Sequence, residues 1–482
     1  MKSFNEEGED RMDRSESKGG KISSYEISQI IMEKCRCANI DGVVSIYDEV
    51  SNDYTPIDSD RGEYIIRNSM DEGIKLYIGT FSIREAVKWI KSDQKLIYVE
   101  AKDLQQRNYY LNYLDGLVNI ASSEVIQRKT PEFYFTYHLN MKRPGTFDKE
   151  KFEESEYYKF LKRTFDDKKQ RDTFEEIVGL CISNIRNRKI SLFFYGPSNS
   201  GKSVALSLIK NIVGNKFVSA VSFSQLGEEF TVAQLFGKHL NVSGEMSGIA
   251  NKRIDIFKSL TGSDAITVCY KGQDHFVFDN KALFLFACNE LPIVAKATDA
   301  DEAFFKRMRI LPFKNVVDPE DIIDNLAERL LEERELIVSR AMEALKRLKE
   351  NNFVFSNQKE MNKVVEGYIN DVNSFLAFAQ KHIRRNPKKA VASCQLEKYY
   401  RLFCDKKGVD VMYSSSWSRI LKSIFHVTRK NITNDPSVPY NSRGYKGIEL
   451  VDLDELEERG QEVTDEQDTT KELGIFKKKH AI

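Results

Sequence analysis

The sequence predicts an α/β fold built around a phosphate-binding loop. Residues 196–203 read Gly-Pro-Ser-Asn-Ser-Gly-Lys-Ser and fit the pattern G-x-x-x-x-G-K-[ST] in full. The apolar, aromatic run at 190–195 is typical of a buried strand, and the apolar spacing at 204–209 favours a helix. Further strand-like and helical runs alternate between 190 and 315. Strand, glycine-containing loop and helix in this order are the context that a nucleotide-binding loop requires.

The loop residues indicate ATP and Mg²⁺ as cofactors. Glycines let the backbone curl so that N–H groups face a triphosphate, and the helix N-terminus adds partial positive charge. We expect Lys202 to reach the β- and γ-phosphates and the Ser203 hydroxyl to coordinate Mg²⁺. A chance glycine turn before a helix is the alternative. The predicted nucleotide contacts are Gly196, Pro197, Ser198, Asn199, Ser200, Gly201, Lys202, Ser203 and Val204.

Composition favours a cytoplasmic, multidomain protein without a membrane partner. The 482 residues include 73 basic and 73 acidic side chains, so the net charge does not point to nucleic acid. Seven scattered cysteines suggest a reducing compartment, and Cys35 and Cys37 have no second pair with which to form a zinc site. No apolar run is long enough to span a membrane, and the acidic N-terminus does not resemble a signal peptide.

Changes in composition along the chain divide it into seven parts. A stripe of apolar residues between Leu326 and Leu348 predicts a helical lid after the nucleotide-binding core. The predicted parts are a disordered tail at 1–22, an N-terminal α+β domain at 23–115, a helical domain at 116–189, an ATPase core at 190–320, a helical lid at 321–370, a winged-helix domain at 371–450 and a charged tail at 451–482.

Two polar residues follow apolar strands downstream of the loop. Glu245 ends the run 240–245, where a carboxylate would polarise the attacking water and help to hold Mg²⁺. Gly244 stands where many such ATPases have a second acid, which leaves the metal assignment open. Asn289 directly follows the apolar run 283–288. It is expected beside the loop, where it would contact the γ-phosphate or orient the water. The alternative for Asn289 is a turn residue before Pro292.

Arg307 and Arg309 precede a predicted strand and have no carboxylate partner nearby in sequence. In a ring of subunits, one of them would reach the neighbouring nucleotide as an arginine finger, a group that accelerates phosphoryl transfer by about 10³-fold or more. Arg307 is the first candidate and Arg309 the second.

Two further regions are candidates for DNA binding. The runs 265–270 and 275–278 predict a hairpin whose tip carries Lys271, with His275 nearby; an ordinary surface hairpin is the alternative. Residues 371–450 hold fifteen Lys or Arg against six Asp or Glu, in a helix, helix and wing pattern. A basic, solvated domain without DNA contacts is the alternative there. The candidate DNA contacts are Lys271, His275, Arg419, Lys422, Arg443 and Lys446.

The order of these motifs closely resembles superfamily 3 helicases, in particular the helicase half of phage and plasmid primase–helicases and their poxvirus relatives. The resemblance is carried by GPSNSGKS, the strand with Glu245, KSLTGSDAITVCYK, FLFACNELP and FFKRMRILPF, and covers about 25–450. It implies an AAA+-type ATPase that forms a hexameric ring and moves 3′ to 5′ on single-stranded DNA. The residues matching Lys202, Ser203, Glu245 and Asn289 would then serve the nucleotide.

The resemblance further implies that Arg307 acts in trans and that the Lys271 hairpin lines the ring channel. Nothing before residue 190 looks like a primase domain, so a separate primase is a candidate partner. Such stand-alone forms resemble the initiator–helicases of phage satellites, pathogenicity islands and other mobile elements, whose C-terminal domain can bind duplex origin DNA. Single-stranded and forked DNA would occupy the channel. The alternatives are a DNA-stimulated regulatory ATPase that does not unwind, and a DNA-binding protein with a degenerate nucleotide pocket.

Overall fold

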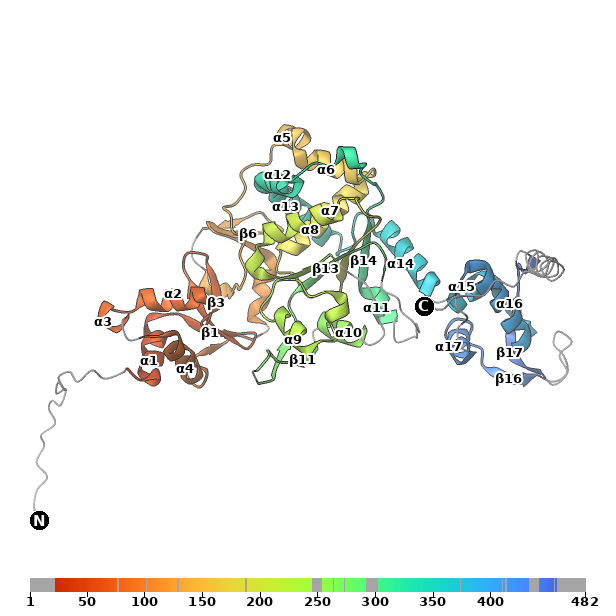
Figure 1. Cartoon of the computed structure of the whole chain (residues 1–482), viewed down its shortest axis with the longest axis horizontal. Helices are drawn as coiled ribbons and strands as arrows, with labels where there is room; N and C mark the ends of the chain where they lie inside the picture. The colour runs from red at the N-terminus through yellow and green to blue at the C-terminus, as the bar shows by residue number, and fades with distance from the viewer. Residues whose placement is uncertain are drawn as a thin grey trace, which may run out of the picture. The chain divides into compact units, whose positions relative to one another are not determined.

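The computed structural model describes residues 22–75, 78–100, 102–127, 130–186, 189–244, 254–262, 264–272, 274–291, 302–372, 374–409, 411, 414–432, 442–454 and 456. They fall into two compact units, Met1–Arg143 and Pro144–Ile482. Helices and strands occur in both units, and the second contains a parallel sheet (Figure 1). The predicted mixed α/β class is therefore confirmed.

The first unit contains a four-stranded sheet flanked by helices. Its strands are β1 (Cys37–Ile40), β2 (Val43–Asp48), β3 (Asp53–Pro56) and β4 (Ile97–Tyr98), in the order β3-β2-β1-β4. Its helices are α1 (Ser24–Lys34), α2 (Asp60–Ser69), α3 (Glu72–Lys75) and α4 (Thr80–Lys91). Ser23 and Glu26 form a capping box that fixes the start of α1. Ile31, Ile46 and Ile90 are fully buried in the apolar core of this unit.

A second, antiparallel sheet belongs to the same unit. It contains β5 (Tyr110–Tyr113), β6 (Gly116–Asn119) and β7 (Val125–Ile126), in that order. A buried polar network ties it to the first sheet: the Asn52 amide donates to Asn112 Oδ1 at 3.3 Å and to Thr130 Oγ1 at 3.1 Å. The Asn112 amide donates in return to the Asn52 carbonyl at 3.1 Å. Buried amides need such partners, so these contacts hold the two sheets together.

The expected boundary between 115 and 116 differs from the division in the structure. Residues 116–143 group with the first unit, and strands β6 and β7 occupy part of the segment for which a helical domain was predicted. The physical reason is the pairing of β6 with β5, together with the Asn52 network, which joins residues far apart in sequence. Helices of the second unit begin only at Lys149.

The second unit is built on a five-stranded parallel sheet. Its strands are β8 (Ser191–Tyr195), β9 (Val218–Ser219), β10 (Leu240–Ser243), β13 (Leu283–Cys288) and β14 (Met308–Pro312), in the order β14-β8-β13-β10-β9. The central strands are apolar because helices cover both faces of such a sheet. Tyr195 pairs with Cys288 on one side and with Pro312 on the other, so these strands end at one edge.

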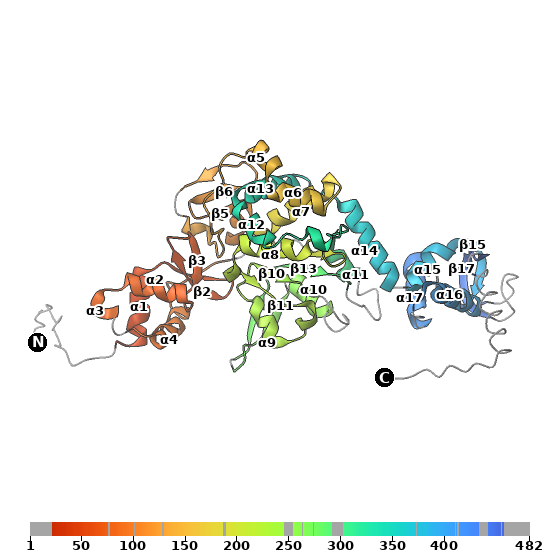
Figure 2. The same ribbon diagram turned by 45° about the horizontal axis from the view of Figure 1, so that its top comes forward.

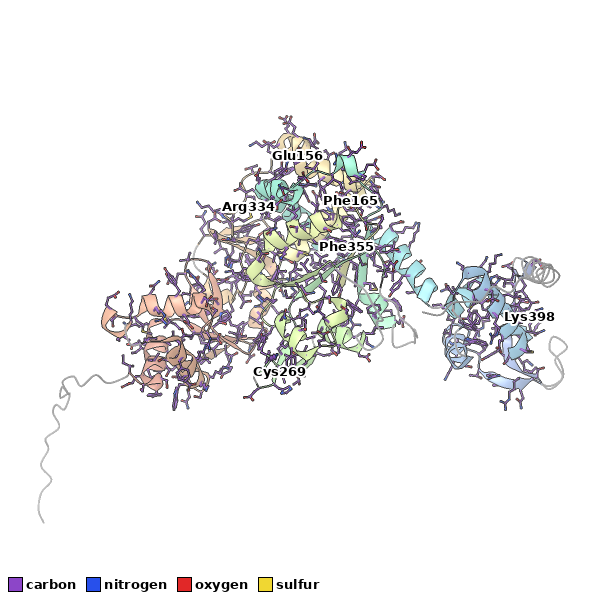
Figure 3. All side chains as sticks on the ribbon, viewed as in Figure 1. Glu156, Phe165, Cys269, Arg334, Phe355 and Lys398 are labelled. Carbon is purple, nitrogen blue, oxygen red and sulfur yellow. The ribbon has the colours of Figure 1, made fainter. Side chains whose placement is uncertain are left out.

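One side of the sheet is covered by α7 (Lys168–Ile182), α8 (Lys202–Val213) and α13 (Arg334–Glu350), with the other helices of this layer nearby (Figure 2). These are α5 (Lys149–Glu154), α6 (Glu156–Thr164) and α12 (Leu326–Glu332). The ring of Phe165, labelled in Figure 3, packs against Phe174 and Phe313. Leu330 and Ile337, from the stripe predicted for the lid, are fully buried, with α12 packing on α8 and α13 along α7.

Two ion pairs reinforce the contact between α7 and α13. Arg340 donates to both carboxylate oxygens of Glu175, at 3.0 and 2.7 Å. Arg347 donates to Glu176 at 3.0 Å, and the Ser356 backbone N–H donates to the same carboxylate at 2.9 Å. Only 1% of each glutamate side chain is exposed, so both carboxylates depend on these partners.

The other side of the sheet carries α9 (Glu229–Val232), α10 (Ile254–Gly262) and a hairpin (Figures 1 and 2). Strands β11 (Ala265–Val268) and β12 (Phe276–Asp279) pair antiparallel, as the sequence predicts, from Ala265 opposite Asp279 to Val268 opposite Phe276. Helix α11 (Glu302–Arg307) leads into β14, and α14 (Gln358–Val372) packs against β14.

The C-terminal part has its own core. Its elements are α15 (Ser374–His382), β15 (Ile383–Ala392), α16 (Ser393–Lys407), α17 (Ser414–Phe425), β16 (Arg429–Ile432) and β17 (Ser442–Leu450), with an antiparallel sheet in the order β15-β17-β16. Phe375 stacks on Trp417 at 5.3 Å, and Tyr400 meets both rings edge-on. Among the described residues, no helix has the length and hydropathy needed to cross a membrane.

Candidate nucleotide site

The predicted phosphate loop connects the central strand β8 to helix α8 at the edge where the parallel strands end. Gly201 (φ +89°) precedes the first residue of α8, and Asn199 (φ +57°) also has a left-handed backbone. Gly196 has a φ of +159°, and a Cβ there would lie 1.9 Å from the Phe313 carbonyl oxygen. Only glycine fits at Gly196, because the backbone after β14 passes directly against it.

Lys202 is a buried cation whose hydrogen-bond partners among the described residues are neutral. Its ammonium donates to the Gly196 carbonyl at 2.8 Å, the Pro197 carbonyl at 2.5 Å and the Ser200 hydroxyl at 3.1 Å. Only 7% of the residue is exposed, and burial lowers the pKa of the ammonium. Within the described part of the chain, the ammonium contacts two backbone carbonyls and one hydroxyl, and no carboxylate. A buried ammonium without an anionic partner fits an anionic ligand such as a phosphate.

Asn289 lies next to the loop, where the sequence placed it. Its side-chain amide donates to the Ser198 hydroxyl at 3.1 Å, and the backbone N–H of Gly196 donates to the Cys288 carbonyl at 3.2 Å. The end of β13 therefore contacts the loop through both backbone and side chain. The alternative role of Asn289, in a turn before Pro292, involves a residue outside the described ranges.

The metal-ligand candidates are only partly described. Ser203 lies in the first turn of α8 with an exposed side chain, and Val204 is half-buried. Strand β10 runs parallel to β13, with Ser243 opposite Phe286, so Gly244 leaves the sheet at the same edge as the loop. Glu245, the expected carboxylate, lies outside the described residues.

Arg307 and Arg309 lie at the opposite end of the sheet from the loop. Met308, between them, pairs with Ser191 at the start of β8, whereas the loop follows Tyr195 at its end. Five residues of strand separate these ends by about 13 Å. Within one chain, the two arginines are therefore remote from the loop 196–203.

The two arginines also differ in environment. Arg307 donates to the Ala303 carbonyl at 2.7 Å, and its Nε is buried without a hydrogen-bond partner among the described residues. Burial lowers the pKa of Arg307, an effect that the charge of Asp264 opposes. Arg309 donates to the carbonyls of Lys306 and Met308, at 2.9 and 3.0 Å. Burial also lowers the pKa of Arg309.

The two DNA-contact candidates of the hairpin, Lys271 and His275, differ in their contacts. Lys271 is exposed in the turn, next to Gly272 (φ +80°). His275 lies in the same connection between β11 and β12, directly before β12, and its Nε2 contacts Glu229 Oε1 at 2.9 Å. Glu229 is distant in sequence and was not singled out as a candidate, because no local pattern links it to the hairpin.

The basic candidates of the C-terminal part lie on α17 and β17. The side chains of Lys422, Arg443 and Lys446 are exposed; Arg419 belongs to α17, but its side chain lies outside the described set. Sequence reasoning did not single out four further exposed cations on β15, although the run RRNPKK could have indicated them. They are Arg384, Arg385, Lys388 and Lys389.

Comparisons with known proteins match the part of the chain that holds the loop. A family model described as a family of unknown function (DUF5906) matches residues 194–307, from β8 to the end of α11. The "Putative helicase 121R" of Invertebrate iridescent virus 3 is 29% identical over 193 residues, which are 38% of this chain and 20% of the viral protein. The chain thus spans about a fifth of the length of that relative. It is similar, in part, to a putative viral helicase.

Two solved structures of the NrS-1 C-terminal region, both apo, also align with the chain. The first has a TM-score of 0.46 and 13% identity and covers 89% of this chain and 100% of that one. The second has a TM-score of 0.44 and 13% identity, with coverage of 89% and 99%.

Proposed function

We propose that this chain is an ATP-dependent DNA helicase that initiates replication of a mobile genetic element. The observation that carries the proposal is Lys202, a buried ammonium held by a glycine-containing loop at the carboxyl edge of a parallel sheet. Ligands of open α/β sheets bind at this edge. The partial similarity to a putative viral helicase supports the choice of helicase over other ATPases.

The residues at this edge fit ATP and Mg²⁺. The loop N–H groups and the start of α8 supply partial positive charge, and Lys202 supplies a full charge for the phosphates. Ser203 would hold Mg²⁺, which neutralises the charge that develops on the phosphates when it is bound. Asn289, already hydrogen-bonded to Ser198, would orient the γ-phosphate or the attacking water, and Glu245 would accept the proton of that water.

Arg307 would complete the site of a neighbouring subunit. Because it lies at the far end of its own sheet, it cannot reach its own loop, but it can reach a second copy packed against that end. A closed ring places one such junction between every two copies. We propose a hexamer in which ATP lies between Lys202 of one subunit and Arg307 of the next, with Arg309 as the second candidate. Helices α12 to α14 are the candidate lid.

DNA contacts would come from two regions. Lys271, exposed at the hairpin turn, would contact phosphates of the strand in the ring channel, and such contacts do not depend on sequence. The order α15, β15, α16, α17, β16 and β17 supports a winged helix, with α17 as the recognition helix and β16 and β17 as the wing. Lys422, Arg443 and Lys446 are its exposed cations and would bind origin duplex. Translocation from 3′ to 5′ is part of the same proposal.

The first test is Lys202→Ala, compared with Lys210→Ala on the exposed side of the same helix. We expect Lys202→Ala to lower ATP hydrolysis by about 100-fold or more, since the phosphates would lose a buried cation. Lys210→Ala should keep wild-type turnover. Equal hydrolysis by the Lys202→Ala variant and the wild type would contradict the nucleotide assignment.

The second test measures strand displacement on forked DNA with either a 3′ or a 5′ tail. ATP-dependent displacement that requires the 3′ tail and is lost in Lys202→Ala is the expected result. ATP hydrolysis that DNA stimulates, without displacement on either substrate, would instead indicate a regulatory ATPase. Mass measurement of the assembled particle on single-stranded DNA tests the hexamer.

A further inference from the structure

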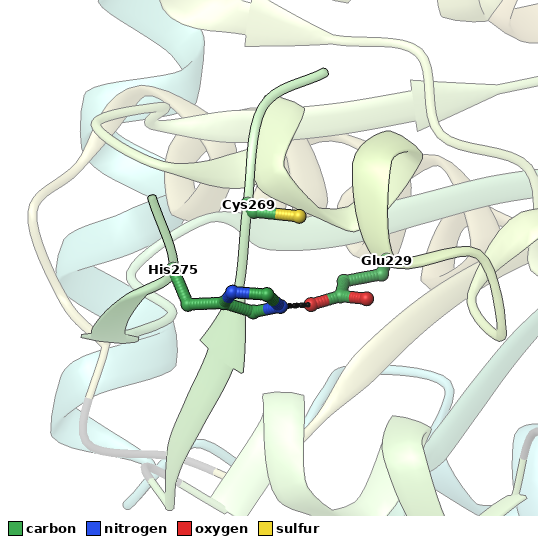
Figure 4. A group of neighbouring side chains, drawn as sticks. All are labelled: Glu229, Cys269 and His275. Atoms are coloured by element: carbon green, nitrogen blue, oxygen red, sulfur yellow. Dashed lines mark ion pairs between the residues drawn. The ribbon is translucent and has the colours of Figure 1, made fainter. Parts of the chain in front are cut away.

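Three potential metal ligands from separate segments meet at the turn end of the β11–β12 hairpin (Figure 4). Glu229 begins α9, Cys269 directly follows β11, and His275 directly precedes β12. One ligand atom from each side chain lies within 4.8 Å of the other two. Among the described residues, this is the one group of at least three Cys, His, Asp or Glu side chains that meets this criterion.

The spacing of the three atoms is close to that of a metal site. Ligands of a tetrahedral Zn²⁺, at about 2.0–2.3 Å from the ion, lie about 3.3–3.8 Å from one another. His275 Nε2 and Glu229 Oε1 are 2.9 Å apart, and the third atom lies within the 4.8 Å limit. Small side-chain rotations would therefore bring all three atoms to the distances of a shared ion. Only 5% of Cys269 is exposed, whereas Glu229 and His275 face solvent and leave a path for the ion.

The backbone holds these positions in place without a metal. The last pair of the hairpin, Val268 opposite Phe276, fixes Cys269 and His275 across from each other. Tyr270 stacks on Phe276 at 5.4 Å, and its hydroxyl donates to the Ala233 carbonyl at 3.1 Å, close to α9. A site whose ligands are held by paired strands and packed rings loses little entropy when it binds an ion.

We propose that Glu229, Cys269 and His275 bind one Zn²⁺ ion, which joins the turn end of the β11–β12 hairpin to α9. Thiolate and imidazole ligands favour Zn²⁺ over Mg²⁺ or Ca²⁺, and three protein ligands leave a fourth position for water. Binding releases the Cys269 thiol proton to solvent, and the two negative ligands then balance the charge of the ion. The site itself does not depend on the ATPase assignment.

The site has a consequence for the hairpin. The ion would replace the contacts that His275 and Cys269 make with Glu229 by three bonds to one centre. Lys271, two residues after Cys269, would then lie in a turn whose two ends are fixed to α9. A role of the fixed turn in DNA binding rests on the proposed function, whereas the fixing of the turn by the ion does not.

The test uses the full-length protein, stripped with chelator and then dialysed against Zn²⁺ or titrated with Co²⁺. We expect one equivalent of Zn²⁺ per chain and a thiolate-to-cobalt charge-transfer band in the near ultraviolet. Cys269→Ser should remove the band, and His275→Gln should lower the affinity for Zn²⁺ at least about 10-fold. Circular dichroism checks that each variant is folded.

Cys394→Ser is the matched control, because Cys394 is an exposed thiol far from this group in sequence. It should keep both the Zn²⁺ equivalent and the band. A wild type without the charge-transfer band, or Zn²⁺ binding that is equal in the wild type and Cys269→Ser, would overturn the proposal and leave a simple Glu229–His275 ion pair. Because neither readout uses ATP, failure of the helicase proposal would not affect this result.

Discussion

At the scale of single residues, Gly196 shows how closely the loop 196–203 packs against the end of the sheet. A methyl group at this position would meet the Phe313 carbonyl oxygen at 1.9 Å, well inside van der Waals contact. Since the obstacle is backbone, either the loop or the chain after β14 must shift. The sequence pattern alone requires a glycine here, and the structure supplies the reason.

We therefore predict that Gly196→Ala lowers ATP affinity by at least about 10-fold and costs about 1–3 kcal/mol of stability, as expected for strained backbone. Gly145→Ala is the control, because a Cβ at Gly145 would have no neighbour within 4 Å. Binding of a fluorescent ATP analogue and chemical denaturation measure the two effects. Wild-type affinity in the Gly196→Ala variant would show that the loop tolerates the shift.

Asp48, at the end of β2, allows a prediction of pH dependence. Burial by itself would raise the pKa of Asp48, but hydrogen bonds from Arg61 and from the Val50 backbone N–H outweigh burial and hold the pKa below its usual value. The carboxylate accepts from Arg61 at 2.6 and 2.9 Å. A depressed pKa in the folded state means that the ionised form stabilises the fold.

We predict that Asp48→Asn costs about 1–2 kcal/mol at pH 7, a value reduced for the partial exposure of Arg61. The stabilisation is present above the unfolded pKa of about 4 and is lost as pH falls through that value toward the folded pKa. The difference between variant and wild type should therefore shrink between about pH 5 and pH 3. Denaturation curves of the wild type and the variant, recorded across this pH range, measure the difference, and Asp58→Asn at an exposed carboxylate is the control.

At the scale of elements, the contact between α7 and α13 depends on buried charge. Burial raises the pKa of Glu175, although Arg340 opposes this effect through two hydrogen bonds. Arg340 also lies over the ring of Phe152, 4.8 Å from its centroid. The guanidinium thus combines charge pairing with aromatic packing, and its removal leaves a buried carboxylate alone.

Arg340→Ala should lower the free energy of unfolding by about 3–5 kcal/mol, the usual cost of breaking a buried pair. Arg334→Ala is the control: Arg334 begins α13 and is exposed, so its loss should cost less than about 0.5 kcal/mol. Urea denaturation, followed by far-ultraviolet circular dichroism, measures the free energy of unfolding of both variants. Addition of Glu175→Gln to Arg340→Ala should recover part of the loss, because no charge then remains buried; no recovery would contradict the account.

At the scale of the whole molecule, the proposed ring leads to a complementation test. Lys202→Ala and Arg307→Ala should each be inactive alone, the latter by about 10³-fold or more. In an equal mixture, about one junction in four would combine an intact Lys202 with an intact Arg307, so turnover should return to about a quarter of the wild-type rate. ATP hydrolysis on single-stranded DNA measures the recovery. A mixture as inactive as its components would exclude action in trans.

Local sequence patterns predicted those parts of the molecule that local chemistry determines. The loop lies between one strand and one helix, so 190–209 could be interpreted directly, and Asn289 followed from an apolar run that ends in an amide. Features made by distant segments could not be predicted. The unit boundary at Arg143 depends on Asn52 meeting Asn112 and Thr130, and the Glu229 group joins a helix to a hairpin; neither contact leaves a periodic signal in the sequence.

The order of strands in the parallel sheet also has a consequence for protein synthesis. Strand β8 is made early, but both of its neighbours, β13 and β14, come much later in the chain. The loop that follows β8 depends on Cys288 and on the backbone near Phe313 for its shape. A nascent chain on the ribosome must therefore keep this apolar strand unpaired until nearly the whole sheet has been translated, an interval in which chaperones would find a binding site.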